Sequence, residues 1–443
     1  MKYLFAFQAA IILGMLLFCN NTFAQPARSP ILLGKPTAED IYYRGTEAYF
    51  DEKYEVAILY FDRAIKMDEE VHSRAYNMRG QSNYKLENYE VALLDFDKAI
   101  ETAPRFAEAY NSRGSLNLTM ENYDEALDDL NEAIRLDPRY SDALFNKGQV
   151  YMKTNELTQA IRFFTKAIKY NGDDSDFFVS RGLAYYDLEM YDSSVWSLDT
   201  ALIINPSNLK ALKSRANSNF KLEEFNLAME DIDEAISIDS VDYWLWNKRG
   251  ILHEKLGDKE EVIIDFTNAI KLAPDTAFIY CNRGDAFRIL KKYDEALLDY
   301  NKSLELDSTY MAALNNRGLV YDLTGEDELA VADFSKSIKL DSVKTAFSLN
   351  NRANSYRKLK QFEKARIDVE KSIVLNENNG WAYATRALIF ADEGKDNLFF
   401  ENIELAISKP LAYPLKEKLE EVKSLEKYKN DERFLEILKK SEE

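Results

Sequence analysis

Residues 280–307 read YCNRGDAFRILKKYDEALLDYNKSLELD, and the pattern of this stretch recurs along most of the chain. Its Gly284 belongs to a column of small residues spaced by about 34 positions. The column consists of Gly45, Gly80, Gly114, Gly148, Gly182, Ala216, Gly250, Gly284, Gly318, Ala353 and Ala387. Self-similarity at a fixed period of this length indicates a protein built from stacked, equivalent units.

Each unit carries two more small residues after the first, at Ala296 and Ser303 in this stretch, with the large Tyr300 between them. The spacing of these three positions, i, i+4 and i+7, places them on one face of a helix. Two helices approach closely only where their side chains are small. Each unit is therefore predicted to be two helices joined by a tight turn. No stretch alternates with period two over the length of a strand, so the predicted fold class is all-α.

These columns resemble the tetratricopeptide repeat family. The resemblance covers about residues 38–410, as ten clear units and a degenerate eleventh, and the stretch quoted above looks like the NRG variety of the repeat. It implies a right-handed superhelical solenoid of about eleven antiparallel helix pairs, with the first helices lining a concave groove. It also implies a protein that binds other proteins or peptides in this groove and has no catalytic activity of its own.

The N-terminus has the three-part pattern of a secretory signal peptide. Lys2 precedes an apolar run over residues 4–18, and small or polar residues follow up to Ala24. Cleavage is predicted after Ala24, which makes residues 1–24 the signal and places the protein in the periplasm or outside a Gram-negative cell. A lipoprotein anchored through Cys19 is disfavoured, because Phe18 stands where a small residue is needed. No integral membrane segment is expected after cleavage.

The segments that flank the repeats are expected to differ from them. Residues 25–37 contain three prolines and are predicted to be an unstructured leader. Residues 411–443 leave the period and are predicted to form C-terminal capping helices, because a solenoid needs an end with a polar outer side.

Composition argues against nucleic-acid binding and against catalysis. The chain has 76 acidic and 57 basic residues, for a net charge of −19, whereas nucleic-acid binding depends on clustered Lys and Arg. Its two His residues, His72 and His253, lie about five repeats apart, and Cys281 has no His in its own repeat. We therefore expect no catalytic residue, no metal site and no cofactor.

A column of arginines has two interpretations. Arg283 and Arg317 belong to it, and Asp299 and Asp333 follow them by sixteen positions, which an antiparallel helix pair brings close together. The arginines could form a ladder that clamps anionic ligands, or each could form a structural bridge to its Asp. We favour the bridge, because an Arg beside a carboxylate is already satisfied.

The concave face is expected to carry the partner-binding residues. A peptide could pair with the asparagines there, since an amide both donates and accepts hydrogen bonds. An ordinary solvated polar face is the alternative. These asparagines are Asn282, Asn316 and Asn351 at one repeat position, with Asn315 and Asn350 beside them.

Two aromatic residues, Trp244 and Phe278, could anchor a partner or could pack against the next helix. Lys213 and Lys248 belong to a local basic patch. In part, Lys213 matches the carboxylate clamp that some members of the family use. However, Lys248 stands where such a clamp needs Asn and Phe278 stands where it needs Lys, so no clamp is predicted.

Four hydroxyl residues lie in the turns between repeats, each directly after an Asp. Their context resembles the O-glycosylation acceptor motif of exported proteins in Bacteroides-like bacteria. The alternative is that Asp and Ser simply cap helix ends in these turns. The four residues are Ser240, Thr276, Ser308 and Ser342.

Together these patterns predict an exported, non-catalytic scaffold that binds a partner protein or peptide. The alternative is a substrate-recognition or accessory subunit of an envelope enzyme that acts on peptidoglycan or polysaccharide. The sequence leaves the identity of the partner and the oligomeric state open.

Overall fold

The computed structural model describes residues 35–341, 345–410, 419 and 422–440. All regular elements in these residues are helices, and the predicted all-α solenoid is confirmed. The predicted signal peptide with Cys19 and Ala24, most of the leader, Ser342 and most of residues 411–421 lie outside the described residues.

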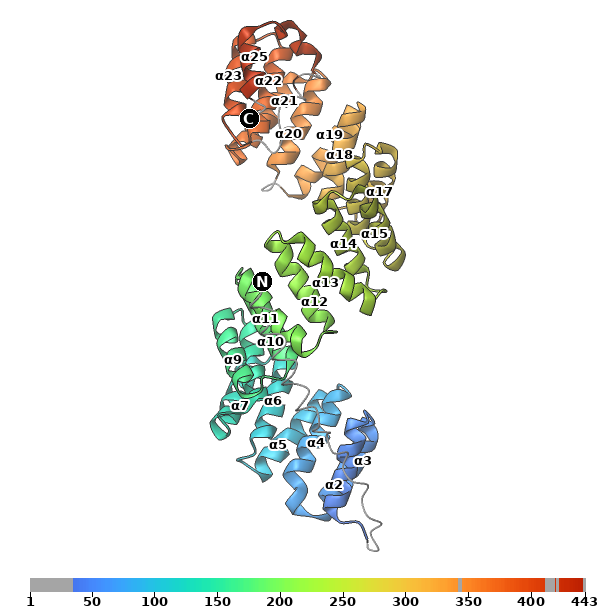
Figure 1. Cartoon of the computed structure of the whole chain (residues 1–443), viewed down its shortest axis with the longest axis vertical. Helices are drawn as coiled ribbons and strands as arrows, with labels where there is room; N and C mark the ends of the chain where they lie inside the picture. The colour runs from blue at the N-terminus through green and yellow to red at the C-terminus, as the bar shows by residue number, and fades with distance from the viewer. Residues whose placement is uncertain (1–34, 342–344, 411–418, 420–421, 441–443) are drawn as a thin grey trace, which may run out of the picture. The chain divides into compact units, whose positions relative to one another are not determined.

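The chain divides into two compact units, which we describe separately. Unit 1 is Met1–Met190 (Figure 1). Its described helices are α2 Ala38–Phe50, α3 Tyr54–Met67, η1 Glu69–Val71, α4 His72–Lys85, α5 Tyr89–Thr102, α6 Ala107–Thr119, α7 Tyr123–Leu136, α8 Ser141–Lys153, α9 Leu157–Tyr170 and α10 Ser175–Asp187.

Unit 2 is Tyr191–Glu443. Its described helices are α11 Tyr191–Ile204, α12 Leu209–Lys221, α13 Phe225–Ile238, α14 Tyr243–Leu256, α15 Lys259–Leu272, α16 Ala277–Ile289, α17 Tyr293–Leu306, α18 Met311–Thr324, α19 Asp327–Leu340, α20 Ala346–Lys358, α21 Phe362–Leu375, α22 Gly380–Asp392, α23 Asp396–Ile407, η2 Lys423–Tyr428 and α25 Glu432–Lys440.

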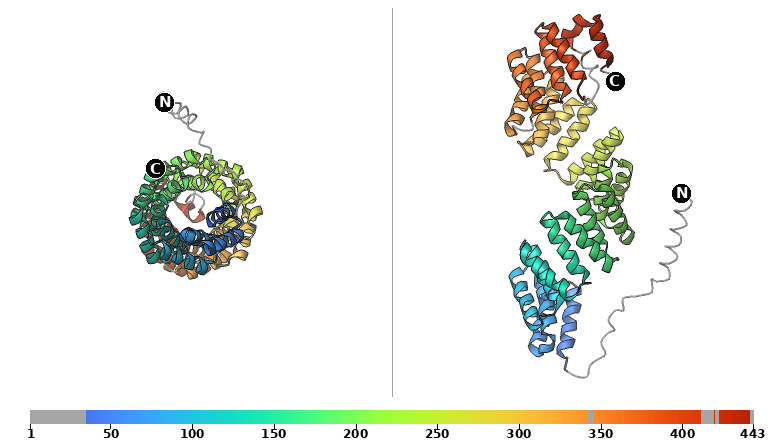
Figure 2. Two further views of the ribbon diagram at one scale, coloured as in Figure 1. Left: turned by 90° about the horizontal axis from the view of Figure 1, so that it is seen from below. Right: turned by 90° about the vertical axis from the view of Figure 1, so that its left-hand side faces the viewer.

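Consecutive helices within a unit pack in antiparallel pairs, as both directions of view show (Figures 1 and 2). We call the even-numbered helices first helices and the odd-numbered helices that follow them second helices. First helices also contact the first helices of neighbouring repeats, as α16 contacts α18, and α18 contacts α20. The turn inside each pair needs a left-handed residue, which is Lys291 (φ 58°) between α16 and α17 and Gly325 (φ 84°) between α18 and α19.

The column of small residues exists because a large side chain of the second helix, in most repeats an aromatic ring and at Gly114 that of Leu130, lies against each described glycine. A Cβ added at Gly284 would lie 2.8 Å from Cε1 of Tyr300, closer than packed carbon atoms come. Where the column holds Ala216 instead, the residue sixteen positions later is the smaller Ile232. The size of the first-helix residue thus matches the size of its second-helix neighbour, which is what close packing without strain requires.

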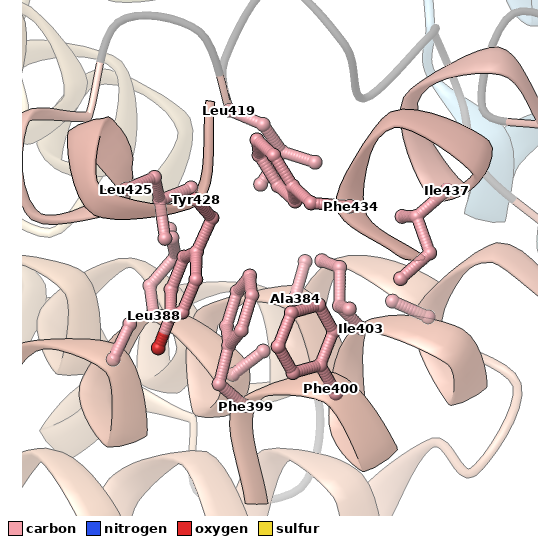
Figure 3. Packing of buried hydrophobic residues seen from close by; sticks show 13 residues of the cluster. Ala384, Leu388, Phe399, Phe400, Ile403, Leu419, Leu425, Tyr428, Phe434 and Ile437 are labelled. Atoms are coloured by element: carbon pink, nitrogen blue, oxygen red, sulfur yellow. The ribbon is translucent and has the colours of Figure 1, made fainter. Parts of the chain in front are cut away.

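The described part of the C-terminal segment covers the last helix pair. The ring of Tyr428 in η2 stacks on Phe399 of α23, with centroids 4.8 Å apart and planes 3° apart (Figure 3). Phe434 of α25 joins the same buried cluster, and the Tyr428 hydroxyl donates a hydrogen bond to Asp396 Oδ1 at 2.5 Å. Aromatic burial of this kind closes the apolar end of the repeat array.

Candidate functional site

The residues expected to bind a partner lie on the first helices of unit 2, from α12 to α22. We call this surface the first-helix face: the exposed and half-buried side chains of α12, α14, α16, α18, α20 and α22. The polar groups of this surface differ in how many of their hydrogen bonds are already made within the protein. The arginine column lies beside it, between the first and second helices.

Seven arginines of the column, Arg283 and Arg317 among them, each hold the aspartate of their own repeat, whereas Arg386 donates to Asn402. Arg283 donates from Nε and Nη2 to the two carboxylate oxygens of Asp299, both at 2.8 Å. Arg317 makes the same bidentate contact with Asp333, both at 2.7 Å. Both aspartates are buried, and the hydrogen bonds that Asp333 accepts from Arg317 raise the pKa of this arginine above its usual value.

The same guanidinium groups have a second partner that the sequence reading did not identify. Arg317 Nη1 donates to Asn301 Oδ1 at 2.6 Å, and Arg283 Nη1 donates to Thr267 Oγ1 at 3.1 Å. Both acceptors lie sixteen positions earlier, on the second helix of the preceding repeat. They escaped notice because their residue type varies. Arg283 and Arg317 therefore each join two consecutive repeats and are occupied on both sides.

Three of the predicted asparagines are partly used by neighbouring repeats. Asn282 Nδ2 donates to Asn247 Oδ1 at 3.0 Å, and Asn316 Nδ2 donates to Asp285 Oδ2 at 2.8 Å. Asn315 Oδ1 accepts from Ser348 Oγ at 2.8 Å. No described residue donates to Asn282 Oδ1, so its half-buried amide keeps an acceptor for a partner.

The other two asparagines, Asn350 and Asn351, each have a polar side-chain atom that is buried. Asn350 is 6% exposed and donates a long hydrogen bond of 3.5 Å to Asn351 Oδ1. Among the described residues, Asn350 Oδ1 and Asn351 Nδ2 are buried without a hydrogen-bond partner. A partner would therefore reach these two atoms only if neighbouring side chains moved.

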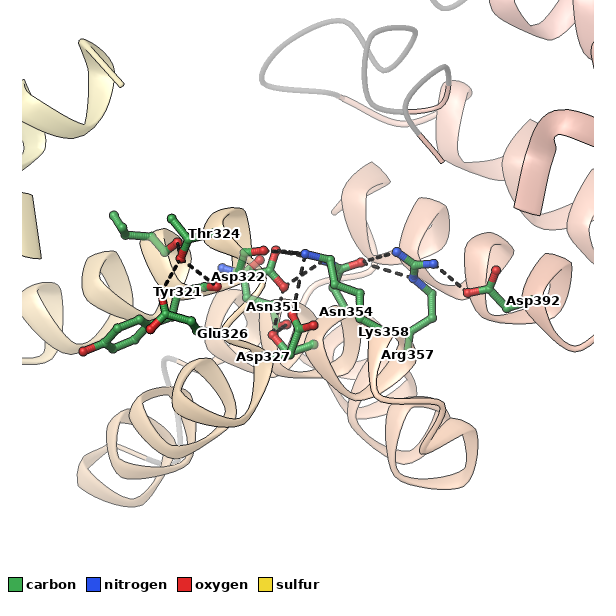
Figure 4. Close-up of polar contacts among 12 residues, drawn as sticks. Tyr321, Asp322, Thr324, Glu326, Asp327, Asn351, Asn354, Arg357, Lys358 and Asp392 are labelled. Carbon is green, nitrogen blue, oxygen red and sulfur yellow. Dashed lines mark hydrogen bonds and ion pairs between the residues drawn. The ribbon is translucent and has the colours of Figure 1, made fainter. Parts of the chain in front are cut away.

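At the C-terminal end of the face, charged side chains of neighbouring first helices form ion pairs with one another (Figure 4). Asp322 of α18 accepts from Asn354 Nδ2 at 3.1 Å and pairs with Lys358 Nζ at 3.1 Å, both residues being on α20. Arg357 of α20 donates to Asp392 of α22 at 2.6 Å. We call these five residues the closed network, since their two positive and two negative charges balance.

At the N-terminal end of the face, two lysines cross the seam between α12 and α14 in opposite directions. Lys213 of α12 forms an ion pair with Asp242, and its Nζ lies 5.7 Å from the centre of the Trp244 ring of α14. Lys248 of α14 places its Nζ 4.0 Å from the centre of the Phe220 ring of α12. Both contacts are cation–π interactions.

The two lysines differ in their electrostatic surroundings. Among the described residues, no carboxylate pairs with Lys248. Burial, and after it the nearby charge of Lys221, lower the pKa of Lys248 to about 8.

The two aromatic candidates have different surroundings. Phe278 packs, partly buried, against the hydrophobic cluster of Phe266 and Ile279, which is the packing role. Trp244 is half-buried, and its backbone N–H donates to Asp242 at the start of α14. Trp244 thus keeps part of its ring at the surface of the first-helix face.

The turns between repeats use their aspartates structurally. Asp239 Oδ1 accepts from the N–H of Val241 at 3.1 Å, and Asp307 Oδ1 accepts from that of Thr309 at 2.8 Å. Asn205 makes the same contact in a turn of another repeat. The hydroxyl residues Ser240 and Ser308 are exposed, and Thr276 is half-buried.

The described part of the chain offers little support for a metal site, a reactive cysteine or a membrane-spanning helix. It contains no group of three or more His, Cys, Asp or Glu side chains placed to hold a metal ion. Cys281 is a buried free thiol whose pKa is raised to about 12 by burial. None of the helices described has the length and apolarity to cross a bilayer.

Models of the tetratricopeptide repeat match the chain over more than half of its length. The matched residues are 42–107, 118–178, 245–276, 277–310, 312–343 and 348–379. No curated protein matches the chain.

Several solved structures are similar to the chain at low identity. A tetratricopeptide repeat protein from Parabacteroides merdae is 20% identical, with 56% of this chain and 97% of that one covered, at a TM-score of 0.45. YrrB, described as having an unusual peptide-binding site, is 21% identical over 42% of this chain and 95% of its own, at 0.38. Yeast Tom70 is 15% identical over 86% of this chain and 93% of its own, at 0.43.

Proposed function

Because the chain belongs to the tetratricopeptide repeat family, we propose that it is a non-catalytic scaffold that binds a partner protein or peptide on the first-helix face of unit 2. Repeat proteins of this kind present extended surfaces to their partners. The alternative, an accessory subunit of an envelope enzyme, would use the same surface.

The observation that carries this proposal is the unused binding capacity between α12 and α16. Lys248 has no carboxylate partner among the described residues, Asn282 keeps an amide oxygen, and Trp244 keeps part of its ring exposed. A partly exposed aromatic ring beside unsatisfied polar groups is typical of protein interfaces. In the closed network, by contrast, Lys358 and Arg357 are already paired with Asp322 and Asp392.

The test compares two sets of substitutions in the same assay. The purified protein serves as bait for the envelope fraction of its host, and each captured protein is then purified and its Kd measured. Asn282→Ala, Asn316→Ala and Trp244→Ala together should weaken a true partner at least about tenfold, because interface anchors of this kind cost over 1 kcal/mol each.

Asn226→Ala with Asn268→Ala provides the matched control, since it removes amides from the second helices α13 and α15 instead. Equal affinity of the triple variant, the control and the wild type would place the binding site elsewhere. The identity of the captured protein separates a general scaffold from an accessory subunit of an envelope enzyme.

We also propose that the protein is exported and begins at Gln25. The support is the pattern of residues 1–24 in the sequence. Intact-mass measurement of protein from the envelope of the host should show the loss of these residues. A mass that retains them, or a lipid on Cys19, would contradict the proposal.

The exposed hydroxyls in the turns remain candidates for O-glycosylation. Because Asp239 and Asp307 already shape their turns, and Asn205 does so in another repeat, the aspartates need no glycan to explain them. Peptide mass spectrometry on protein from the native host decides the matter. Unmodified Ser240, Thr276, Ser308 and Ser342 would leave the aspartates with the turn role alone.

A further inference from the structure

The chain contains the dipeptide Asn-Gly twice, at Asn171–Gly172 and at Asn379–Gly380. Asparagine is a chemically labile residue, and a following glycine has no Cβ to hinder attack of its backbone nitrogen on the asparagine side chain. Both asparagines have nearly the same backbone angle, with ψ 95° at Asn171 and ψ 93° at Asn379. A difference in their reactivity must therefore come from what surrounds each dipeptide in the fold.

Asn379 and Gly380 are held at the start of a helix. Asn379 is the N-cap of α22, and its carbonyl oxygen accepts a hydrogen bond from the N–H of Ala382 at 3.0 Å. Gly380, the first residue of α22, is buried. The glycine nitrogen reaches the side-chain carbon only if the chain turns about the Cα–C bond of the asparagine. At Asn379 this rotation would break the first turn of α22.

Asn171 and Gly172 lie in the turn between α9 and α10. Asn171 directly follows the last residue of α9, and Gly172 and Asp173 are exposed to solvent. Among the described residues, no hydrogen bond reaches the carbonyl oxygen of Asn171 or the N–H of Gly172. The side chain of Asn171 makes a long hydrogen bond, in which Oδ1 accepts from the N–H of Asp173 at 3.4 Å. Rotation about the Cα–C bond of Asn171 therefore breaks this weak bond and no bond of a helix.

We propose that Asn171 is a site of spontaneous deamidation, which converts it to a mixture of aspartate and isoaspartate in the folded protein. The backbone nitrogen of Gly172 loses its proton to solvent and forms a bond to Cγ of Asn171. The Cγ–Nδ2 bond then breaks, and Nδ2 takes a proton from solvent and leaves as ammonia. Water opens the resulting succinimide ring. Attack of water at Cγ gives aspartate, and attack at the backbone carbonyl carbon gives isoaspartate.

The reaction changes both the charge and the covalent structure of this turn. A new carboxylate appears shortly before Asp173 and Asp174, in a turn that already carries two negative charges. Asp174 is the N-cap of α10 and accepts from the N–H of Asp176 at 2.9 Å. In isoaspartate the main chain passes through Cβ and Cγ, so the connection that leads to this cap becomes longer. Because the reaction is not reversed, the modified fraction increases with the age of the protein.

Incubation of the purified full-length protein at neutral pH, followed by peptide mass mapping over time, tests this proposal. The tryptic peptide 170–181 carries Asn171, and the tryptic peptide 372–386 carries Asn379. Digestion in ¹⁸O-labelled water marks any deamidation that occurs during the digestion itself. We expect Asn171 to react at least about tenfold faster than Asn379, because at Asn379 a backbone hydrogen bond opposes the rotation. An isoaspartate-specific methyltransferase should label peptide 170–181.

The chain unfolded in guanidinium chloride is the matched control, since both dipeptides lose their surroundings there and their rates should become similar. A difference of the same size in the unfolded chain would overturn the inference from the fold.

Gly172→Ala should slow the reaction of the folded protein without disturbing its packing. A Cβ at Gly172 would have the carbonyl oxygen of Ile168 as its nearest neighbour in space, at an ordinary contact distance of 3.5 Å. Equal rates at Asn171 and Asn379 in the folded protein would overturn the proposal. So would the absence of any reaction at Asn171, or a rate there that Gly172→Ala leaves unchanged.

Discussion

Two regions of the first-helix face differ in how they surround a half-buried positive charge. In the closed network, Lys358 and Arg357 are each paired with an aspartate on a neighbouring first helix. On the α12–α14 seam, Lys248 lies over an aromatic ring with no acid beside it in the described structure. The lysine and the arginine of the closed network are thus paired with carboxylates, whereas Lys248 has no carboxylate partner among the described residues.

The closed network should be the more sensitive of the two regions to the loss of a charge. Asp322→Ala removes the side-chain acceptor of Asn354, Ser355 and Lys358, and it leaves the partly buried Lys358 ammonium with the longer ion pair to Asp327, at 3.6 Å. We expect the free energy of unfolding to fall by about 2 kcal/mol, less than for a fully buried pair because Lys358 stays partly exposed.

Chemical denaturation of Asp322→Ala measures this loss, and Asp322→Asn, which keeps one acceptor oxygen, should cost less. If the two substitutions are equally harmful, or if neither has any effect, the network contributes nothing to holding the first helices together.

The Arg–Asp bridges should be intermediate in size. Arg317→Ala and Asp333→Ala should each destabilise the protein, and the double variant should cost less than the sum. The expected coupling is about 1 kcal/mol, because the two side chains share a bidentate contact. Additivity in this double-mutant cycle would mean that the contact does not stabilise the fold.

Substitution of Lys248, in contrast, should increase the free energy of unfolding. Lys248→Met removes a half-buried charge that lacks a counter-charge and keeps apolar contact with Phe220. We expect unfolding at pH 7 to become harder by about 0.5 kcal/mol. A destabilisation instead would indicate that the cation–π contact outweighs the cost of burial, and the contrast between the two regions would disappear.

The smallest expected effect is on pH dependence. The pKa of Lys248 is about 8 in the folded protein, below its ordinary value of 10.5, so the unfolded chain binds more protons between these two values. The stability of the wild type relative to Lys248→Met should therefore rise as the pH increases from 8 to 10.5. Denaturation of both proteins at pH 7 and pH 10 measures it, and a constant difference would show that this lysine titrates normally.

The fold followed from the sequence because its determinants repeat. A Gly such as Gly284 and a ring such as Tyr300, sixteen positions apart, specify the close contact of one helix pair, and the pattern recurs in register. The Arg283 to Asp299 spacing likewise placed two ionic partners on facing helices. Local packing of this kind is periodic and can be seen in a single sequence.

The details of the first-helix face did not follow from the sequence. Asn282 and Asn351 occupy the same repeat position, yet Asn282 keeps a usable acceptor, whereas Asn351 Nδ2 is buried without a hydrogen-bond partner among the described residues. Their difference depends on side chains contributed by neighbouring repeats, which vary from one repeat to the next. The same holds for Lys248, which stands at the repeat position of Asn282 but carries a different side chain, one that lies over Phe220 of the preceding repeat.

The arginine column has an evolutionary consequence. Its bidentate partner inside each repeat is usually an aspartate, whereas its partner in the preceding repeat is Asp233 for Arg249, Thr267 for Arg283 and Asn301 for Arg317. The large side chain that lies against each glycine, such as Tyr300 against Gly284, also comes from the same repeat. Recombination in the turns between repeats keeps both matched sets together, and any hydrogen-bond acceptor completes the new junction. Whole repeats can thus be duplicated, deleted or exchanged as genetic units, while a crossover inside a repeat separates partners that depend on each other.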